Sequence, residues 1–141
     1  MEIALLQKNH VTPEFQNQIR ALFQQLAPTK KQLQLLDIFN DKNNITLVYG
    51  IKDGEILGMA SMCVYTVISG KKAWIEDVVV HENERGKGLG RKLMQKLLEV
   101  AKKKGVTELL LFSAEHRVAA KQLYEDLGFK MSASKLYKLQ V

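Results

Sequence analysis

Cysteine, proline and long apolar runs are all scarce in this sequence. A single cysteine, Cys63, excludes a disulfide within the chain, and only two prolines occur among the 141 residues. No apolar run approaches the ~18 residues that a helix needs to cross a bilayer. The first ten residues also lack the basic and apolar regions of a secretory signal. We therefore expect a cytoplasmic protein without membrane contact, folded around one core.

Histidine is also rare, whereas basic residues are plentiful. One cysteine and three histidines show no metal-ligand spacing, so we expect no metal site. The net charge is +6, and the stretch from Arg85 to Lys104 is strongly basic, with Glu99 as its one acid. Such an excess suits a polyanionic small molecule or a nucleic acid. Nucleic acid is disfavoured because the sequence lacks an interleaved set of aromatic side chains and any known recognition module.

The hydrophobic pattern predicts one α/β domain over residues 1–141, with a mixed, mostly antiparallel sheet. Apolar spacing predicts the order β-α-α-β-β-β-α-β-α-β, with helices on both faces of the sheet. Two tight turns, at Asp53-Gly54 and Ser69-Gly70, predict an antiparallel meander. The apolar run that follows the third helix suits a strand that is parallel to the strand preceding that helix. The expected strands are 2–7, 45–51, 55–68, 72–80, 107–114 and one from Phe129 onward; the expected helices are 13–26, 30–40, one between Gly90 and Gly105, and 117–127.

A glycine-rich turn, Arg85–Gly90 (the glycine arm), connects the strand at 72–80 to the next helix. Unpaired N–H groups and the positive end of the helix dipole meet at such a turn, which makes it an anion site. A P-loop is excluded because no Ser or Thr follows a Gly-Lys pair, and a dinucleotide site needs a different glycine spacing. Glycines also let phosphate oxygens approach the backbone. The expected phosphate-binding residues are Arg85, Gly86, Lys87, Gly88, Leu89, Gly90 and Arg91.

Two segments together carry a resemblance to a known family. The glycine arm fits the pattern Arg/Gln-x-x-Gly-x-Gly/Ala, and HRVAAKQLYEDLGF (116–129) is similar to a second signature of the GNAT superfamily of N-acetyltransferases. The resemblance covers nearly the whole chain and implies that the arm binds acetyl-coenzyme A. The run IEDVVV and its distance from Arg85 are similar to glucosamine-6-phosphate N-acetyltransferases. Residues 116–129 also resemble aminoalkylphosphonate acetyltransferases.

Further cofactor contacts follow from the resemblance. It implies that the pantetheine chain pairs with the backbone of Val78, Val79 and Val80 as an added strand. A backbone N–H near Val78 or Val79 would then polarise the acetyl carbonyl. Ser113, at the end of a strand, is a candidate hydrogen-bond partner for pantetheine. Arg117 opens the last helix, where its charge opposes the dipole and suggests a contact with phosphate.

Three residues are candidates for the proton transfers of amine acetylation. Tyr124 matches the family tyrosine that protonates the departing sulfur, and a phenol with a pKa of ~10 holds its proton at neutral pH. Glu76 and Asp77 are candidate bases ahead of the valines. Alternation along a strand points them to opposite faces unless a bulge intervenes. Either carboxylate, or a water, therefore remains open as the base.

The expected function is an acetyl-CoA-dependent N-acetyltransferase acting on a small-molecule amine. The alternatives are a non-catalytic acyl-CoA-binding or regulatory module and a protein N-acetyltransferase. A binding module would need neither Tyr124 nor the acidic pair, which favours catalysis. The acceptor depends on residues 13–40, 55–68 and the C-terminus, which carry no specific signature. Many relatives form homodimers, sometimes by exchanging the last strand, so the resemblance leaves a homodimer open.

Overall fold

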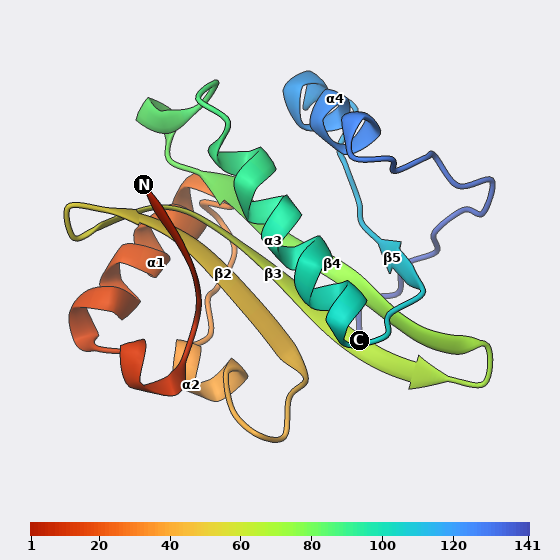
Figure 1. Ribbon diagram of the computed structural model, residues 1–141, viewed down its shortest axis with the longest axis horizontal. Helices are drawn as coiled ribbons and strands as arrows, with labels where there is room; N and C mark the ends of the chain where they lie inside the picture. The colour runs from red at the N-terminus through yellow and green to blue at the C-terminus, as the bar shows by residue number, and fades with distance from the viewer.

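A five-stranded sheet forms the centre of the computed structural model, which describes all of residues 1–141 (Figure 1). The first four strands pair with one another in antiparallel fashion, which confirms the predicted meander. The fifth strand runs parallel to the fourth, which confirms the predicted parallel pair. The strands follow each other across the sheet in chain order: β1 (Glu2–Leu5), β2 (Ile45–Lys52), β3 (Glu55–Val67), β4 (Gly70–Val80) and β5 (Glu108–Leu110).

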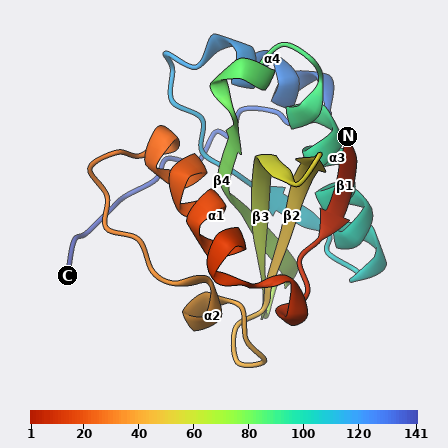
Figure 2. The same cartoon turned by 90° about the vertical axis from the view of Figure 1, so that its left-hand side faces the viewer.

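Helices cover both faces of the sheet, as predicted (Figure 2). The helix α1 (Pro13–Leu26) begins where expected, because Thr12 Oγ1 accepts a hydrogen bond from Phe15 N at 3.1 Å. The predicted helix at 30–40 is reduced to one turn, α2 (Leu35–Ile38). The opposite face carries α3 (Leu89–Lys103), and α4 (Val118–Asp126) lies beyond it. Two 3₁₀ turns, η1 (Lys8–His10) and η2 (Glu82–Glu84), complete the elements.

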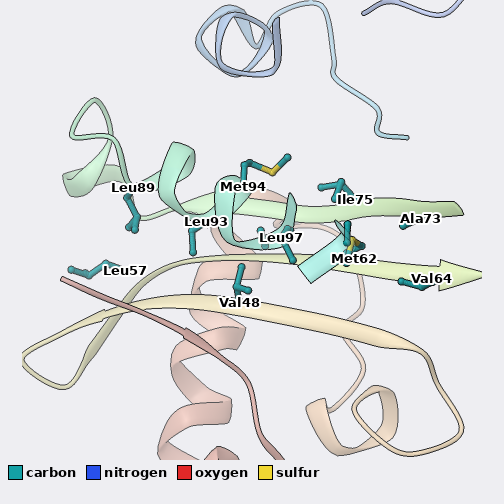
Figure 3. Packing of buried hydrophobic residues seen from close by; sticks show 12 residues of the cluster. Val48, Leu57, Met62, Val64, Ala73, Ile75, Leu89, Leu93, Met94 and Leu97 are labelled. Atoms are coloured by element: carbon teal, nitrogen blue, oxygen red, sulfur yellow. The ribbon is translucent and has the colours of Figure 1, made fainter. Parts of the chain in front are cut away.

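The helix α3 is the main packing element of the sheet. Its residues Leu89, Leu93 and Leu97 point at the strands (Figure 3), and the last two are fully buried. They belong to a cluster of 12 buried residues, while a second cluster of 10 lies under α1 and α2. The i, i+4 row predicted from the sequence is therefore the core-facing row of α3. This packing fixes the position of the helix N-terminus to which the glycine arm leads.

A β-bulge interrupts the pairing of β3 with β4 at the predicted acidic pair. Ser61 is paired with Glu76 but Met59 with Val79, so two β4 residues face one β3 residue. Asp77 takes the left-handed conformation, with φ of 51°, which Asp tolerates better than most residues. The bulge puts Asp77 out of the strand's alternation, so Glu76 and Asp77 are not separated onto opposite faces of the sheet.

The C-terminal part departs furthest from the sequence-based prediction. The strand β5 ends at Leu110 instead of residue 114, and the strand expected from Phe129 onward is wrong, because no strand follows α4. No backbone–backbone hydrogen bond involves a residue after Phe129. Alternating apolar residues form a strand only along a neighbouring strand, and this segment lies along none. Its exposed side chains include Met131, Leu136, Tyr137, Leu139 and Val141. No helix of the chain combines the length and apolarity needed to cross a membrane.

Candidate active site

A fork between β4 and β5 lies beside the predicted cofactor strand. The two strands pair only from Lys72 to Trp74, and β5 ends at Leu110, so beyond Trp74 β4 is paired with β3 on one side and has no strand partner on the other. The amide of His81 donates to Leu57 O on β3 at 2.7 Å. Backbone groups alternate in direction along β4. Those of Val79 therefore point toward β3, like those of His81, and those of Val78 point toward the fork. An extended ligand chain can pair with β4 at this open edge.

The glycine arm leaves the N-terminus of α3 open to an anion. Gly86 and Gly88 have φ of 78° and 85°, which glycine adopts without strain. A methyl group at either position would meet no atom within 4 Å. The helix has neither a capping side chain nor an acidic residue in its first turn. Its first N–H groups are thus free to bind phosphate oxygens, so the arm fits the pyrophosphate of coenzyme A.

Two of the predicted phosphate-binding cations form ion pairs with nearby acids. Arg91 donates to Asp126 Oδ2 at 3.0 Å, and Lys87 lies 3.4 Å from Glu84 Oε1. The Arg85 side chain instead donates to Val80 O at 3.4 Å. Ion pairs at an exposed surface contribute only about 0–1 kcal/mol. A phosphate group can therefore draw these side chains away at little cost.

Tyr124 reaches the same region through α4. A methyl group at Gly90 would lie 3.4 Å from Leu123 Cδ2 and 3.7 Å from Val80 Cγ2, so β4, α3 and α4 meet there. Tyr124 follows Leu123, is half-buried, and has its pKa raised by burial and lowered to a lesser extent by the charge of Arg117. Its phenol therefore holds its proton at neutral pH. Arg117 and Ser113 are exposed on either side of the turn before α4.

The acidic pair has unusual protonation properties for side chains that reach solvent. Loss of solvation raises the pKa of Glu76, and the negative charge of Asp77 raises it further. The pKa of Asp77 is also raised by loss of solvation, while the positive charge of Lys30 opposes both shifts. Cys63 has its pKa raised by burial and by the same two carboxylates. The two acids thus lie close together, and each is a better proton acceptor than an ordinary carboxylate.

A cavity of about 230 Å³ opens beside Asp77, under α1 and α2. Its walls come from α1, the connection to α2, β2 and β3, and nine of its 14 lining residues are hydrophobic. The sequence pointed to residues 13–40 and 55–68 as the acceptor region without naming residues. Side chains that meet across this space, such as Phe23, Ile45 and Asp77, come from elements far apart in the chain. No local spacing pattern could have found them.

Known proteins similar to this chain were found by both sequence and structure. Residues 11–129 match the model of the Acetyltransferase (GNAT) family. A glucosamine 6-phosphate N-acetyltransferase of Trypanosoma brucei brucei is 39% identical over 111 residues, which cover 74% of each chain. The crystal structure of a Trypanosoma brucei acetyltransferase superposes with a TM-score of 0.79 at 26% identity and covers 99% of each chain.

A second sequence relative matches over a shorter part of both proteins. The L-methionine sulfoximine/L-methionine sulfone acetyltransferase of Pseudomonas aeruginosa is 35% identical over 80 residues, or 56% of this chain and 46% of its own length. The chain thus spans about half of that relative. The family match covers the glycine arm, the bulge and α4. The chain belongs to the GNAT family and is an acyltransferase of the N-acetyltransferase type.

Proposed function

We propose that this protein transfers an acetyl group from acetyl-CoA to the primary amine of a small molecule by direct attack. The observation that carries the proposal is the convergence at one end of β4. There the open fork, the phosphate-binding glycine arm and the acidic bulge at Asp77 occupy consecutive parts of one strand and its exit. A cofactor with phosphates in the arm and pantetheine in the fork would direct its far end along β4 toward the bulge.

The binding roles follow from this geometry. Acetyl-CoA, when bound, supplies an acetyl group activated as a thioester. The first N–H groups of α3 hold the pyrophosphate, with Arg85, Lys87 and Arg91 adding positive charge. Backbone groups of Val78 and the N–H of Val80 pair with the pantetheine chain, beside the buried side chain of Val79; the Val80 carbonyl already accepts from Gln25 Nε2 at 2.9 Å. Ser113 and Arg117 contribute from the turn before α4 to pantetheine and phosphate.

The catalytic roles belong to three side chains and one amide. Glu76 or Asp77, directly or through a water, accepts a proton from the attacking amine. The N–H of Val78 donates to the acetyl carbonyl oxygen as it gains negative charge. The bond from nitrogen to the acetyl carbon forms and the carbon–sulfur bond breaks. Tyr124 gives its proton to the departing sulfur.

Similar proteins support a small acceptor. One is named for glucosamine 6-phosphate and another for L-methionine sulfoximine and sulfone, all of them small molecules. The exposed apolar side chains of residues 131–141 also support self-association as a homodimer. Sedimentation velocity tests this part of the proposal. A monomer at every concentration would contradict it.

Calorimetric titration with acetyl-CoA tests the cofactor site. We expect Gly86→Ala to weaken binding about tenfold, because its methyl group enters the space for phosphate oxygens. Gly105→Ala is the matched control, since Gly105 also has a positive φ, of 76°, and open space around it but lies at the other end of α3. Equal effects of the two variants, or no heat from the wild type at high micromolar acetyl-CoA, would contradict the proposal.

Thiol release in the presence of different amines then separates an enzyme from a binding module. We expect a release rate that saturates with at least one small amine. Binding of acetyl-CoA without amine-dependent thiol release would identify a binding module. Release that depends only on a peptide amine would identify a protein N-acetyltransferase.

A further inference from the structure

Three uncharged polar side chains of the cavity beside Asp77 each make a hydrogen bond to the backbone. Gln16 accepts from Leu35 N at 2.7 Å, Gln32 donates to Arg20 O at 3.0 Å, and Ser61 Oγ donates to Glu76 O at 2.9 Å. These bonds fix the three side chains to the backbone. Among the lining residues only Asp77 and Lys31 carry charge, and their charges are opposite.

Most of the remaining lining residues are apolar. They form an apolar wall with side chains from α1, the turn α2 and the strand β2, including Ile19, Phe23, Ile38, Ile45 and Leu47. A polyhydroxylated ligand would bury hydroxyl groups against this wall, at about 1–3 kcal/mol for each group without a partner. The volume, about 230 Å³, lies below the ~300–1,000 Å³ of drug-sized sites. A small ligand with an apolar body is therefore favoured over a sugar.

The two opposite charges favour a ligand that carries both a positive and a negative group. Asp77 reaches solvent, but its carboxylate is partly desolvated, so a positive or hydrogen-bonding amine next to it gains more than it would in open water. Lys31, from the connection between α1 and α2, offers three N–H donors to an anionic group. Lys30 adds positive charge that acts on the same acidic pair.

We propose that the acceptor is an amino acid with an apolar side chain. Its amine lies at Asp77, its carboxylate at Lys31, and its side chain on the apolar wall. This inference rests on the proposed function, since it takes the cavity to be the acceptor site of the same acetyl transfer. The glucosamine 6-phosphate of the Trypanosoma brucei relative lacks this combination of carboxylate and apolar body.

Four acceptors with matched differences test the proposal. L-leucine, isopentylamine, L-serine and glucosamine 6-phosphate are compared by thiol release at saturating acetyl-CoA. Isopentylamine is leucine without its carboxylate, and serine keeps the carboxylate but loses the apolar body. We expect kcat/KM for leucine to exceed that for each of the other three at least tenfold. A value for any of them equal to or above that of leucine would overturn the proposal.

A variant at Lys31 tests the carboxylate contact. Lys31→Gln should raise KM for leucine about tenfold and leave KM for isopentylamine unchanged. Lys8→Gln is the control, because Lys8 is exposed on η1 and does not line the cavity. An equal change for both acceptors, or none for either, would contradict the contact.

Calorimetry with L-leucine in the presence of coenzyme A keeps this proposal distinct from the proposed function. If other amines are acetylated and leucine neither binds nor reacts, the acceptor class is wrong and the function stands. If leucine binds and no amine releases thiol, the function is wrong and the ligand class stands. If leucine does not bind and no amine reacts, both proposals are wrong.

Discussion

Residues 1–104 and residues 105–141 differ sharply in how they are packed. Every buried residue of the chain lies at or before Ala101, and α4 contains none. The first part holds four of the five strands, both clusters of buried residues, the glycine arm and the acidic bulge. The second part carries Ser113, Arg117 and Tyr124 on a segment whose contacts with the first part involve only partly buried or exposed side chains. Those contacts include the ion pair of Arg91 with Asp126.

The part of the chain that stabilises the fold therefore differs from the part that carries Tyr124. The glycine arm and the acidic bulge need fixed positions, and packing of α3 on the sheet fixes them. Tyr124, by contrast, is on a helix that contains no fully buried residue. Truncation of buried side chains in the first part should therefore destabilise the fold, whereas substitutions on α4 should mainly change turnover in a folded enzyme.

The largest effect is expected from Leu97→Ala. Leu97 is fully buried between α3 and the sheet, so its truncation should lower the free energy of unfolding by about 2–5 kcal/mol. Leu123→Ala on α4 is the matched substitution in the second part, where the side chain is only half-buried. We expect less than about half the loss from Leu123→Ala in urea unfolding followed by circular dichroism. Equal losses would remove the contrast between the two parts.

Tyr124→Phe should affect turnover and leave the fold intact. The substitution keeps the ring, which packs edge-on against Phe129 at a centroid distance of 6.0 Å, and removes only the proton donor. We expect kcat to fall tenfold or more, which is ~1.4 kcal/mol or more in the barrier. The affinity for acetyl-CoA and the unfolding midpoint should stay near the wild-type values. Unchanged kcat would remove Tyr124 from the mechanism.

These two substitutions also mark what the sequence could predict. The row of Leu93 and Leu97 could be predicted because helical periodicity is a local pattern in the sequence. The glycine arm could be predicted because its glycine spacing is local as well. The bulge at Asp77 could only be left open from the sequence, because it depends on how β3 pairs with β4. The strand expected after Phe129 was wrong for the same reason: alternation describes a strand without supplying its partner. The cavity beside Asp77 is lined by residues of several elements, so no local motif encodes it.

Asp77→Asn should produce a smaller effect, opposite in sign for stability and activity. The folded state raises the pKa of Asp77, so it disfavours the charged carboxylate. This destabilising contribution is absent at pH values below the ordinary carboxylate pKa of ~3.9 and grows as the pH rises through it. The uncharged amide carries no such contribution. Asn also tolerates the left-handed backbone at this position.

Denaturation of this variant at neutral and acidic pH measures the effect. At neutral pH we expect Asp77→Asn to be more stable than the wild type, with an advantage that fades toward pH 4. We expect lower kcat/KM, and Glu76→Gln is the companion variant in the pH–rate profiles. A less stable Asn variant at neutral pH would show that the carboxylate is needed by the fold. Unchanged profiles in both variants would leave a water as the base.

The smallest effect is expected in the segment after α4. Leu139 is 85% exposed, and no backbone hydrogen bond holds its neighbours, so Leu139→Ser should change the free energy of unfolding by less than about 0.5 kcal/mol in a monomer. Urea unfolding at low and high protein concentration checks this. If the segment is instead buried between two copies of the chain, the loss grows with concentration, because only the associated wild type gains stability by mass action. A loss of several kcal/mol at low concentration would mean that residues 131–141 pack on their own chain. The loosely packed part of the molecule would then end at α4.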